Sequence, residues 1–170
     1  VSVSGDTAVV GAPGDDSGSA YVFVRSGSSW TEQTKLTAFD AAVDARFGSS
    51  VSVSGDTVVV GAYIDDANGF SSGAAYVFER SAGVWTRQAK LRASDAAAGD
   101  LFGLSVSVSG GTAVVGARQD DDGGSGSGSA YVFVRSGSSW TEQAKLTASD
   151  AAAGDGFGFS CVGERRHGGG

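Results

Sequence analysis

The sequence has 170 residues, including 28 glycines and one proline, and its formal net charge at pH 7 is −7. Its length suits one ordinary domain, and its negative charge argues against nucleic acid or an anionic membrane as a partner. The single cysteine excludes an internal disulfide and a thiolate metal cluster, and no apolar run approaches the roughly 18 residues of a membrane helix.

The chain opens on a phrase that returns twice. VSVSGDTAVVGA at residues 1–12 recurs at 51–62 and at 106–117, and each later copy differs from the first at one position. The serine–valine alternation predicts a strand, and the glycine-containing turn after it predicts a hairpin into a second strand. Because the chain begins inside a repeat and with Val1 rather than methionine, we expect residues to precede it.

An acidic, Gly/Ser-rich loop follows each opening phrase, and a second predicted hairpin follows the loop. Residues 20–25 (AYVFVR) are apolar on both faces, which predicts a strand that is covered on both sides. In residues 30–36 (WTEQTKL), period-two alternation places Trp30 and Leu36 on one face and Lys35 on the other. This pattern predicts a half-solvated outer strand.

Three anchors recur every 55 residues: the tyrosine of AYVF, the tryptophan of WTEQ or WTRQ, and the phenylalanine of FG. A four-stranded unit that is buried on both faces and repeated in this way is a propeller blade. We therefore predict an all-β fold, a β-propeller segment of three four-stranded antiparallel blades in an incomplete ring. The predicted units are blade 1 (1–46, without a leading FG), blade 2 (47–101), blade 3 (102–156) and the start of a fourth repeat (157–170).

The repeated aromatic and glycine positions are interpreted as packing between blades rather than as a sugar-stacking surface, because they recur at strand positions with period two. These structural positions are Phe47, Gly48, Gly61, Tyr76, Phe78, Trp85, Phe102, Gly103, Gly116, Tyr131, Phe133 and Trp140.

Residues 47–62 (FGSSVSVSGDTVVVGA), followed by AYVF, resemble the FG-GAP repeat of integrin α-chain propellers and of bacterial secreted or surface proteins. FG stands intact three times, whereas GAP is intact only at residues 11–13. The resemblance covers residues 1–160. It implies an extracellular or cell-surface location, a recognition or adhesion role, and a parent ring of seven blades.

One departure from the family concerns metal. Its calcium-binding repeats carry a DxDxDG-type loop between the first two strands, where this chain has a tight turn with one carboxylate, Asp6 or Asp56. One carboxylate cannot supply the six to eight oxygen ligands of calcium. No metal is expected at these turns and no cofactor is expected elsewhere, with calcium at the acidic loops kept as the alternative.

The predicted strand order places the loop after the second strand of each blade and the blade-to-blade connections at one end, which we call the acidic rim. It holds 13 of the 19 acidic residues, namely Asp15, Asp16, Asp40, Asp44, Asp65, Asp66, Asp95, Asp100, Asp120, Asp121, Asp122, Asp150 and Asp155. Our ligand-binding candidates are Asp15, Asp16, Asp65, Asp66, Asp95, Asp100, Asp120, Asp121 and Asp122. Solubility and aspartate-rich turns are the simpler explanation of the same residues.

The function predicted from these features is a non-enzymatic recognition or adhesion scaffold whose rim binds a protein or a carbohydrate. The body of the repeats holds neither histidine nor cysteine, so nucleophilic catalysis is not expected. Two alternatives stay open. One is a carboxylate-dependent hydrolase or lyase acting on polysaccharide, whose rim aspartates would converge within about 5 to 10 Å. The other is a purely structural or non-functional gene fragment.

Residues 161–170 (CVGERRHGGG) break the repeat. Permissible codons for this stretch, read one base later, spell the start of another blade, so we interpret the tail, with Cys161 and His167, as the product of a frameshift. Three blades leave apolar end faces and unpaired edges. Self-association or further blades are therefore expected to complete the ring.

Overall fold

The computed structural model describes residues 1–38, 40, 44–66 and 68–161, and within them all regular structure is β-strand. The first sheet contains β1 (Ser2–Ser4), β2 (Thr7–Ala12), β3 (Ser19–Ser26) and β4 (Ser29–Leu36). The second contains β5 (Ser50–Ser54), β6 (Thr57–Ala62), β7 (Ala74–Ser81) and β8 (Val84–Leu91). The third contains β9 (Phe102–Ser109), β10 (Thr112–Ala117), β11 (Ser129–Ser136) and β12 (Ser139–Leu146).

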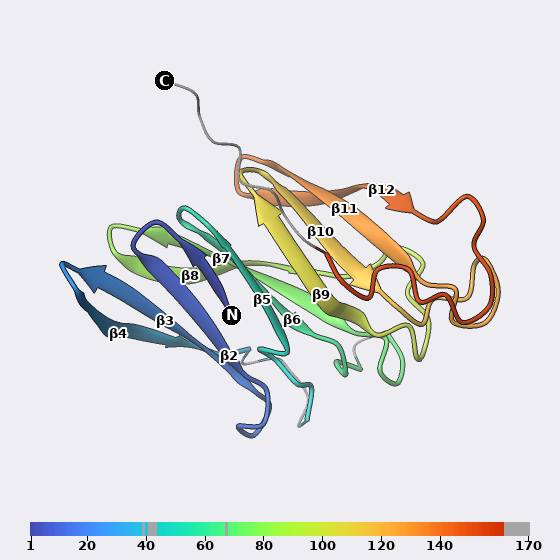
Figure 1. The fold of residues 1–170 in the computed structure, drawn as a ribbon, viewed down its shortest axis with the longest axis horizontal. Helices are drawn as coiled ribbons and strands as arrows, with labels where there is room; N and C mark the ends of the chain where they lie inside the picture. Colours follow the sequence, from blue (N-terminus) through green and yellow to red (C-terminus); the bar gives the residue numbers. More distant parts are fainter. Residues whose placement is uncertain (39, 41–43, 67, 162–170) are drawn as a thin grey trace.

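The three sheets are the predicted blades. Each is antiparallel, keeps its four strands in chain order, and lies beside the next in an open fan (Figure 1). The all-β, three-blade, unclosed propeller segment is thereby confirmed. No described residue belongs to a helix with the length and apolarity to cross a membrane. Residues 162–170, with His167 and most of the tail interpreted as a frameshift product, lie outside the described residues.

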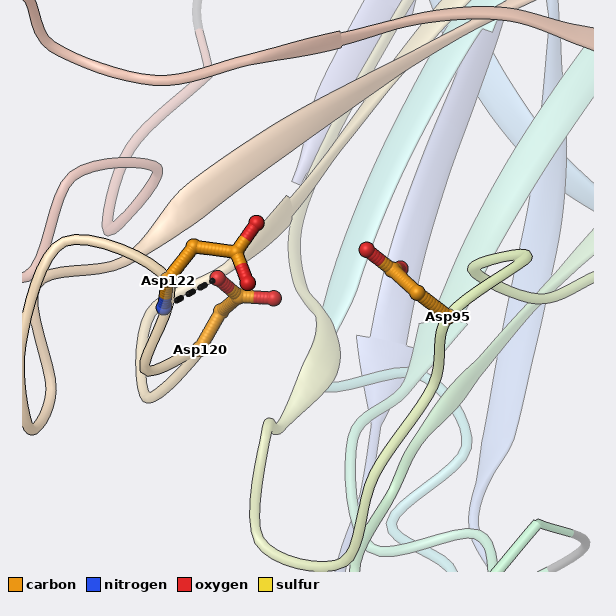
Figure 2. Close-up of side chains that lie close together, drawn as sticks. All are labelled: Asp95, Asp120 and Asp122. Atoms are coloured by element: carbon orange, nitrogen blue, oxygen red, sulfur yellow. Dashed lines mark hydrogen bonds between the residues drawn. The ribbon is translucent and has the colours of Figure 1, made fainter.

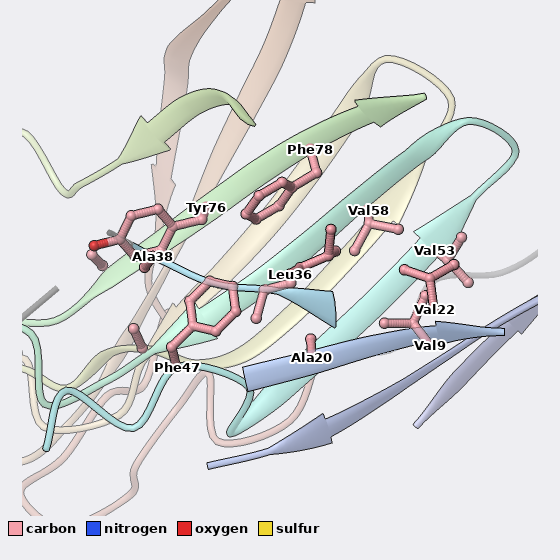
Figure 3. Close-up of a cluster of buried hydrophobic side chains, with 13 residues drawn as sticks. Val9, Ala20, Val22, Leu36, Ala38, Phe47, Val53, Val58, Tyr76 and Phe78 are labelled. Carbon is pink, nitrogen blue, oxygen red and sulfur yellow. The ribbon is translucent and has the colours of Figure 1, made fainter. Parts of the chain in front are cut away.

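The core lies between the blades. Valines and Leu36 of blade 1 pack against the aromatic face of blade 2 (Figure 3), and blades 2 and 3 repeat this arrangement. Tyr76 and Tyr131 are fully buried there, and the inner strand β6 is buried at all six positions. Strands with both faces covered explain why the sequence is apolar on both sides of these segments.

The FG phenylalanines join neighbouring blades. The ring centroid of Phe47 lies 5.4 Å from that of Tyr76 and 6.0 Å from that of Phe78, both edge-on (Figure 3). The backbone N–H of Phe47 also donates to the carbonyl of Ser17 in the blade 1 loop, at 3.0 Å. Phe102 repeats both kinds of contact one blade later. Each FG therefore belongs to a junction rather than to a single sheet.

The glycine at the equivalent position of each blade, Gly11, Gly61 or Gly116, brings the backbones of neighbouring repeats into direct contact. A Cβ added to Gly61 would lie 1.9 Å from the carbonyl oxygen of Gly103, and one added to Gly116 would lie 1.9 Å from that of Gly158. The hydroxyl of Ser50 donates to the same Gly103 oxygen at 2.8 Å. Only glycine allows two backbones to approach this closely.

Polar groups fasten the inner and outer edges of each junction. On the inner strands, the backbone N–H of Val53 donates to Oγ of Ser2 at 3.1 Å. On the outer strands, Nε1 of Trp85 donates to Oε1 of Gln33 at 3.0 Å. Blades 2 and 3 repeat both contacts. The serines that alternate along the inner strands thus serve the neighbouring blade.

A β-bulge interrupts the outer pair of strands in every blade. In blade 1 the register shifts between Val22 and Phe23, so Gln33 on β4 has no partner in the ladder. The same shift occurs in blades 2 and 3. A bulge of this kind inserts one residue and re-aims its side chain, which here reaches the next blade.

The bulge corrects one prediction. Lys35 pairs with Tyr21 and shares its face with Trp30, whereas Leu36 pairs across to the opposite, blade 2 face. The expectation that Trp30 and Leu36 share a face was wrong, because one inserted residue reverses the alternation beyond it. The lysine of each outer strand is consequently turned towards the tyrosine of its own blade.

Candidate functional site

The acidic rim lies where the long connections meet (Figure 1). Lys145, in β12, contacts Asp95 in the β8–β9 connection and Asp120 in the β10–β11 loop, so both kinds of connection reach one place. The short β1–β2 and β3–β4 turns lie at the other end of blade 1 (Figure 1). The rim is therefore built jointly by adjacent blades.

The first aspartate of each loop pairs with the lysine of its own blade, and in blades 2 and 3 it is also buried. Asp65 is 2% exposed and accepts hydrogen bonds from the Tyr76 hydroxyl at 3.0 Å and the Lys90 ammonium at 2.8 Å. Asp120 makes the same two contacts in blade 3. In blade 1 the equivalent Asp15 pairs with its lysine at 2.6 Å but stays part-exposed. These three candidates are held by their own blades.

Blade 3 gathers three carboxylates around one lysine. Asp95, Asp120 and Asp122 each place an oxygen within 4.8 Å of the others (Figure 2). The Lys145 ammonium lies 2.7, 2.9 and 2.6 Å from them, respectively. Calcium needs six to eight oxygen ligands, and an ammonium in contact with all three carboxylates repels a second cation. The cluster therefore does not fit calcium.

The pKa values follow from this arrangement. Burial alone would raise the pKa of Asp120, but the hydrogen bonds from Lys145 and Ser129 outweigh it and hold the pKa below its usual value. The same balance lowers the pKa of Asp95. Burial would lower the pKa of Lys145, yet its three carboxylates raise it. Asp95, Asp120 and Lys145 therefore stay ionised at neutral pH.

The tight-turn aspartates at the opposite end are also paired. Asp6 accepts a hydrogen bond from Nε of Arg25 at 2.8 Å, and Asp56 accepts one from Nε of Arg80 at 2.7 Å. Each arginine also donates its backbone N–H to the carbonyl of the same aspartate. These carboxylates fasten β3 or β7 to the first turn of the blade.

Asp100 differs from the other candidates because burial raises its pKa, and the charges of Asp120 and Asp95 add to the effect. It is 6% exposed and accepts a hydrogen bond from the backbone N–H of Ala97 at 2.6 Å. An amide oxygen can accept this bond without carrying charge.

We therefore expect Asp100→Asn to stabilise the protein at pH 7, by up to about 1 kcal/mol. A raised folded-state pKa means that the ionised form costs stability above that pKa, and the cost disappears as the pH falls through it. The gain should accordingly shrink between pH 7 and pH 4, which urea unfolding at both pH values measures. Asp121→Asn is the matched control, since its exposed carboxylate also accepts a backbone N–H. An equal gain in both variants would contradict the burial explanation.

The second aspartate of each loop points outward. Asp66 and Asp121 are exposed, and each accepts a hydrogen bond from a backbone N–H five residues ahead in its own loop, at 2.6 and 2.7 Å. Asp16 is exposed with a φ of 48°. In the described part of the chain none of the three forms an ion pair. Their charge faces solvent in a fixed loop geometry.

Lys90 and Lys145, and the outer-strand glutamines, were not among the sequence-based candidates. The lysines recur at the 55-residue interval, as do Gln33 and Gln88, and exact repetition of a polar residue on a strand was the available signal. The exposed second aspartate of each loop could not be told from the first in the sequence, because the two are the same residue type at adjacent positions.

A comparison with known sequence families agrees with this architecture. The family described as FG-GAP repeat matches residues 1–23, 30–78, 85–133 and 140–161, which include strands of all three blades and the FG that follows blade 3. No curated protein matches the chain.

Proposed function

Because this chain belongs to the FG-GAP repeat family, we propose that it is a non-enzymatic recognition or adhesion scaffold that presents its acidic rim to a ligand. The observation that carries the proposal is that adjacent aspartates in one loop have different environments. Asp65 and Asp120 are buried and bind a lysine. Asp66 and Asp121, which follow them in the sequence, are exposed to solvent. A protein or carbohydrate partner with basic groups fits this surface. In keeping with the family, the proposed location is extracellular or at the cell surface.

A carboxylate-dependent hydrolase needs carboxyl groups that lie close together, and Asp95, Asp120 and Asp122 do so. Such an enzyme needs one carboxyl group with a raised pKa as the acid and a second as base or nucleophile. Here Lys145 contacts all three carboxylates and lowers the pKa of Asp95 and of Asp120. Asp100 does have a raised pKa, but it is 6% exposed and its carboxylate accepts a hydrogen bond from the backbone N–H of Ala97, so it is poorly placed to protonate a substrate. These features favour the scaffold over the enzyme.

The proposal is tested by binding of a lysine decapeptide, a simple basic probe, followed by calorimetry at low and at physiological salt. Asp66→Asn combined with Asp121→Asn is expected to weaken binding about 3- to 10-fold, and added salt should weaken binding to the unmodified chain.

The matched control is Asp6→Asn combined with Asp56→Asn, which removes the same charge from the opposite end of the blades. Equal weakening in both double variants would mean that the probe senses net charge alone, and the rim would then have no special role. Failure of the unmodified chain to bind at low salt would instead favour the purely structural alternative.

A further inference from the structure

Identical positions in the three blades differ sharply in exposure at the two ends of the array. Leu36 and Leu91 are 4% and 3% exposed because the next blade covers them, whereas their equivalent Leu146 is 43% exposed. In the other direction, Val60 is fully buried against the preceding blade, whereas its equivalent Val10 is 40% exposed. We call the Val10 side of blade 1 the head face and the Leu146 side of blade 3 the tail face.

The aromatic junction is split between these two faces. Phe47 and Phe102, each at the start of a repeat, are fully buried against the tyrosine and phenylalanine of that repeat, but Phe157 is 37% exposed. On the head face, Tyr21 and Phe23 occupy the receiving positions, and within the described residues neither has a ring partner. The tail face thus presents the phenylalanine of an aromatic contact, and the head face presents the tyrosine and phenylalanine that such a residue packs against.

The donor and acceptor of the tryptophan–glutamine hydrogen bond between blades are divided between the two faces in the same way. Trp30 on the head face is the equivalent of Trp85, and Gln143 on the tail face is the equivalent of the Gln33 that accepts from Trp85. Among the described residues, neither Trp30 nor Gln143 has a hydrogen-bond partner for its side chain. Each end thus carries the half of a contact that the other end lacks.

Charge follows the same division. Lys145 binds Asp95 from the preceding blade-to-blade connection, at 2.7 Å. On the head face, Lys35 occupies the lysine position, and among the described residues its one ion pair is with Asp15 of its own loop. Asp150, the equivalent of Asp95, is exposed beside the tail face. A junction between the two ends would pair Lys35 with Asp150.

We propose that the head face of one copy of this chain docks on the tail face of a second copy, reproducing between molecules the junction that blades 1, 2 and 3 form within one. The aromatic, hydrogen-bonding and charged groups then meet in the combination that the chain already uses twice. A head-to-tail contact forms a ring if its rotation closes and an open chain if it does not. Two copies supply six blades, within the usual range of propellers.

Sedimentation velocity of the full chain over a range of concentrations tests the proposal. The unmodified chain is expected to associate as concentration rises. Val10→Arg on the head face and Leu146→Arg on the tail face should each weaken association at least about 100-fold, since each buries an unpaired charge at the junction. Both side chains are exposed in the single chain, so the variants should fold, which circular dichroism checks.

Mixing the two variants supplies the decisive measurement, because Val10→Arg keeps a sound tail face and Leu146→Arg keeps a sound head face. The mixture should form a one-to-one dimer and nothing larger, although each variant alone stays monomeric. Gly14→Arg adds the same charge in an open loop and should associate like the unmodified chain. A monomeric unmodified chain, association that neither face variant weakens, or a mixture that stays monomeric would each overturn the proposal.

Discussion

Gly61→Ala is expected to lower the free energy of unfolding by about 3 kcal/mol or more, because the new methyl group has no space at the junction of blades 2 and 3. The Cβ would lie 1.9 Å from the carbonyl oxygen of Gly103 and 2.3 Å from Oγ of Ser50. The first neighbour is backbone and cannot rotate away, and the second donates to that same oxygen. The blades must therefore separate, and thermal unfolding followed by circular dichroism measures the loss.

The comparison that isolates this steric effect is Gly111→Ala. Neither glycine has a left-handed backbone, so neither substitution carries φ strain, and the nearest atom to a Cβ on Gly111 is Cβ of Arg135 at 3.6 Å. The control should change stability by no more than about 0.5 kcal/mol. If the two variants melt at the same temperature, the contact between Gly61 and Gly103 does not hold the blades together as described.

The blades could be predicted from the sequence because their signals are local. Strand alternation in residues 51–54 and the 55-residue interval between Tyr76 and Tyr131 depend only on neighbouring residues and on counting. The family resemblance added the expectation that Phe47 and its glycine matter, and packing between blades 1 and 2 supplies the physical reason.

The rim was less predictable, because its geometry depends on register and on long-range pairing. The bulge opposite Val22 and Phe23 leaves no mark in a pattern of period two, yet it alone turns Lys35 towards Tyr21. Asp65 and Asp66 are identical in chemistry and adjacent in sequence, but one is 2% exposed and the other lies in solvent. A lysine 25 residues away decides between them, and sequence inspection does not reveal that pairing.

Lys145→Met is expected to lower the free energy of unfolding at pH 7 by about 3 kcal/mol or more, since it leaves Asp120 buried without its cation. Asp120 is 4% exposed, and the ammonium that it loses also binds Asp95 and Asp122. Methionine keeps a long apolar stem against Tyr131, so the variant removes the charge rather than the packing. Urea unfolding provides the measurement.

The pH dependence of that loss distinguishes charge from packing. In the unmodified chain the depressed pKa of Asp120 contributes stability above the unfolded value of about 3.9, and this stability is lost as pH falls through the folded value. Without Lys145, burial raises the pKa of Asp120 instead, so the variant gains stability relative to the unmodified chain as pH falls from 7 to 4. Adding Asp120→Asn should recover much of the loss at pH 7, because position 120 then carries no charge that needs the lost cation. Lys35→Met, which breaks an exposed pair, should change the free energy of unfolding far less than Lys145→Met does at pH 7. Two results would contradict this explanation. One is an equal loss of stability in Lys145→Met and Lys35→Met. The other is a difference in unfolding free energy between Lys145→Met and the unmodified chain that does not change with pH, because the charge of Lys145 would then not be what stabilises the fold.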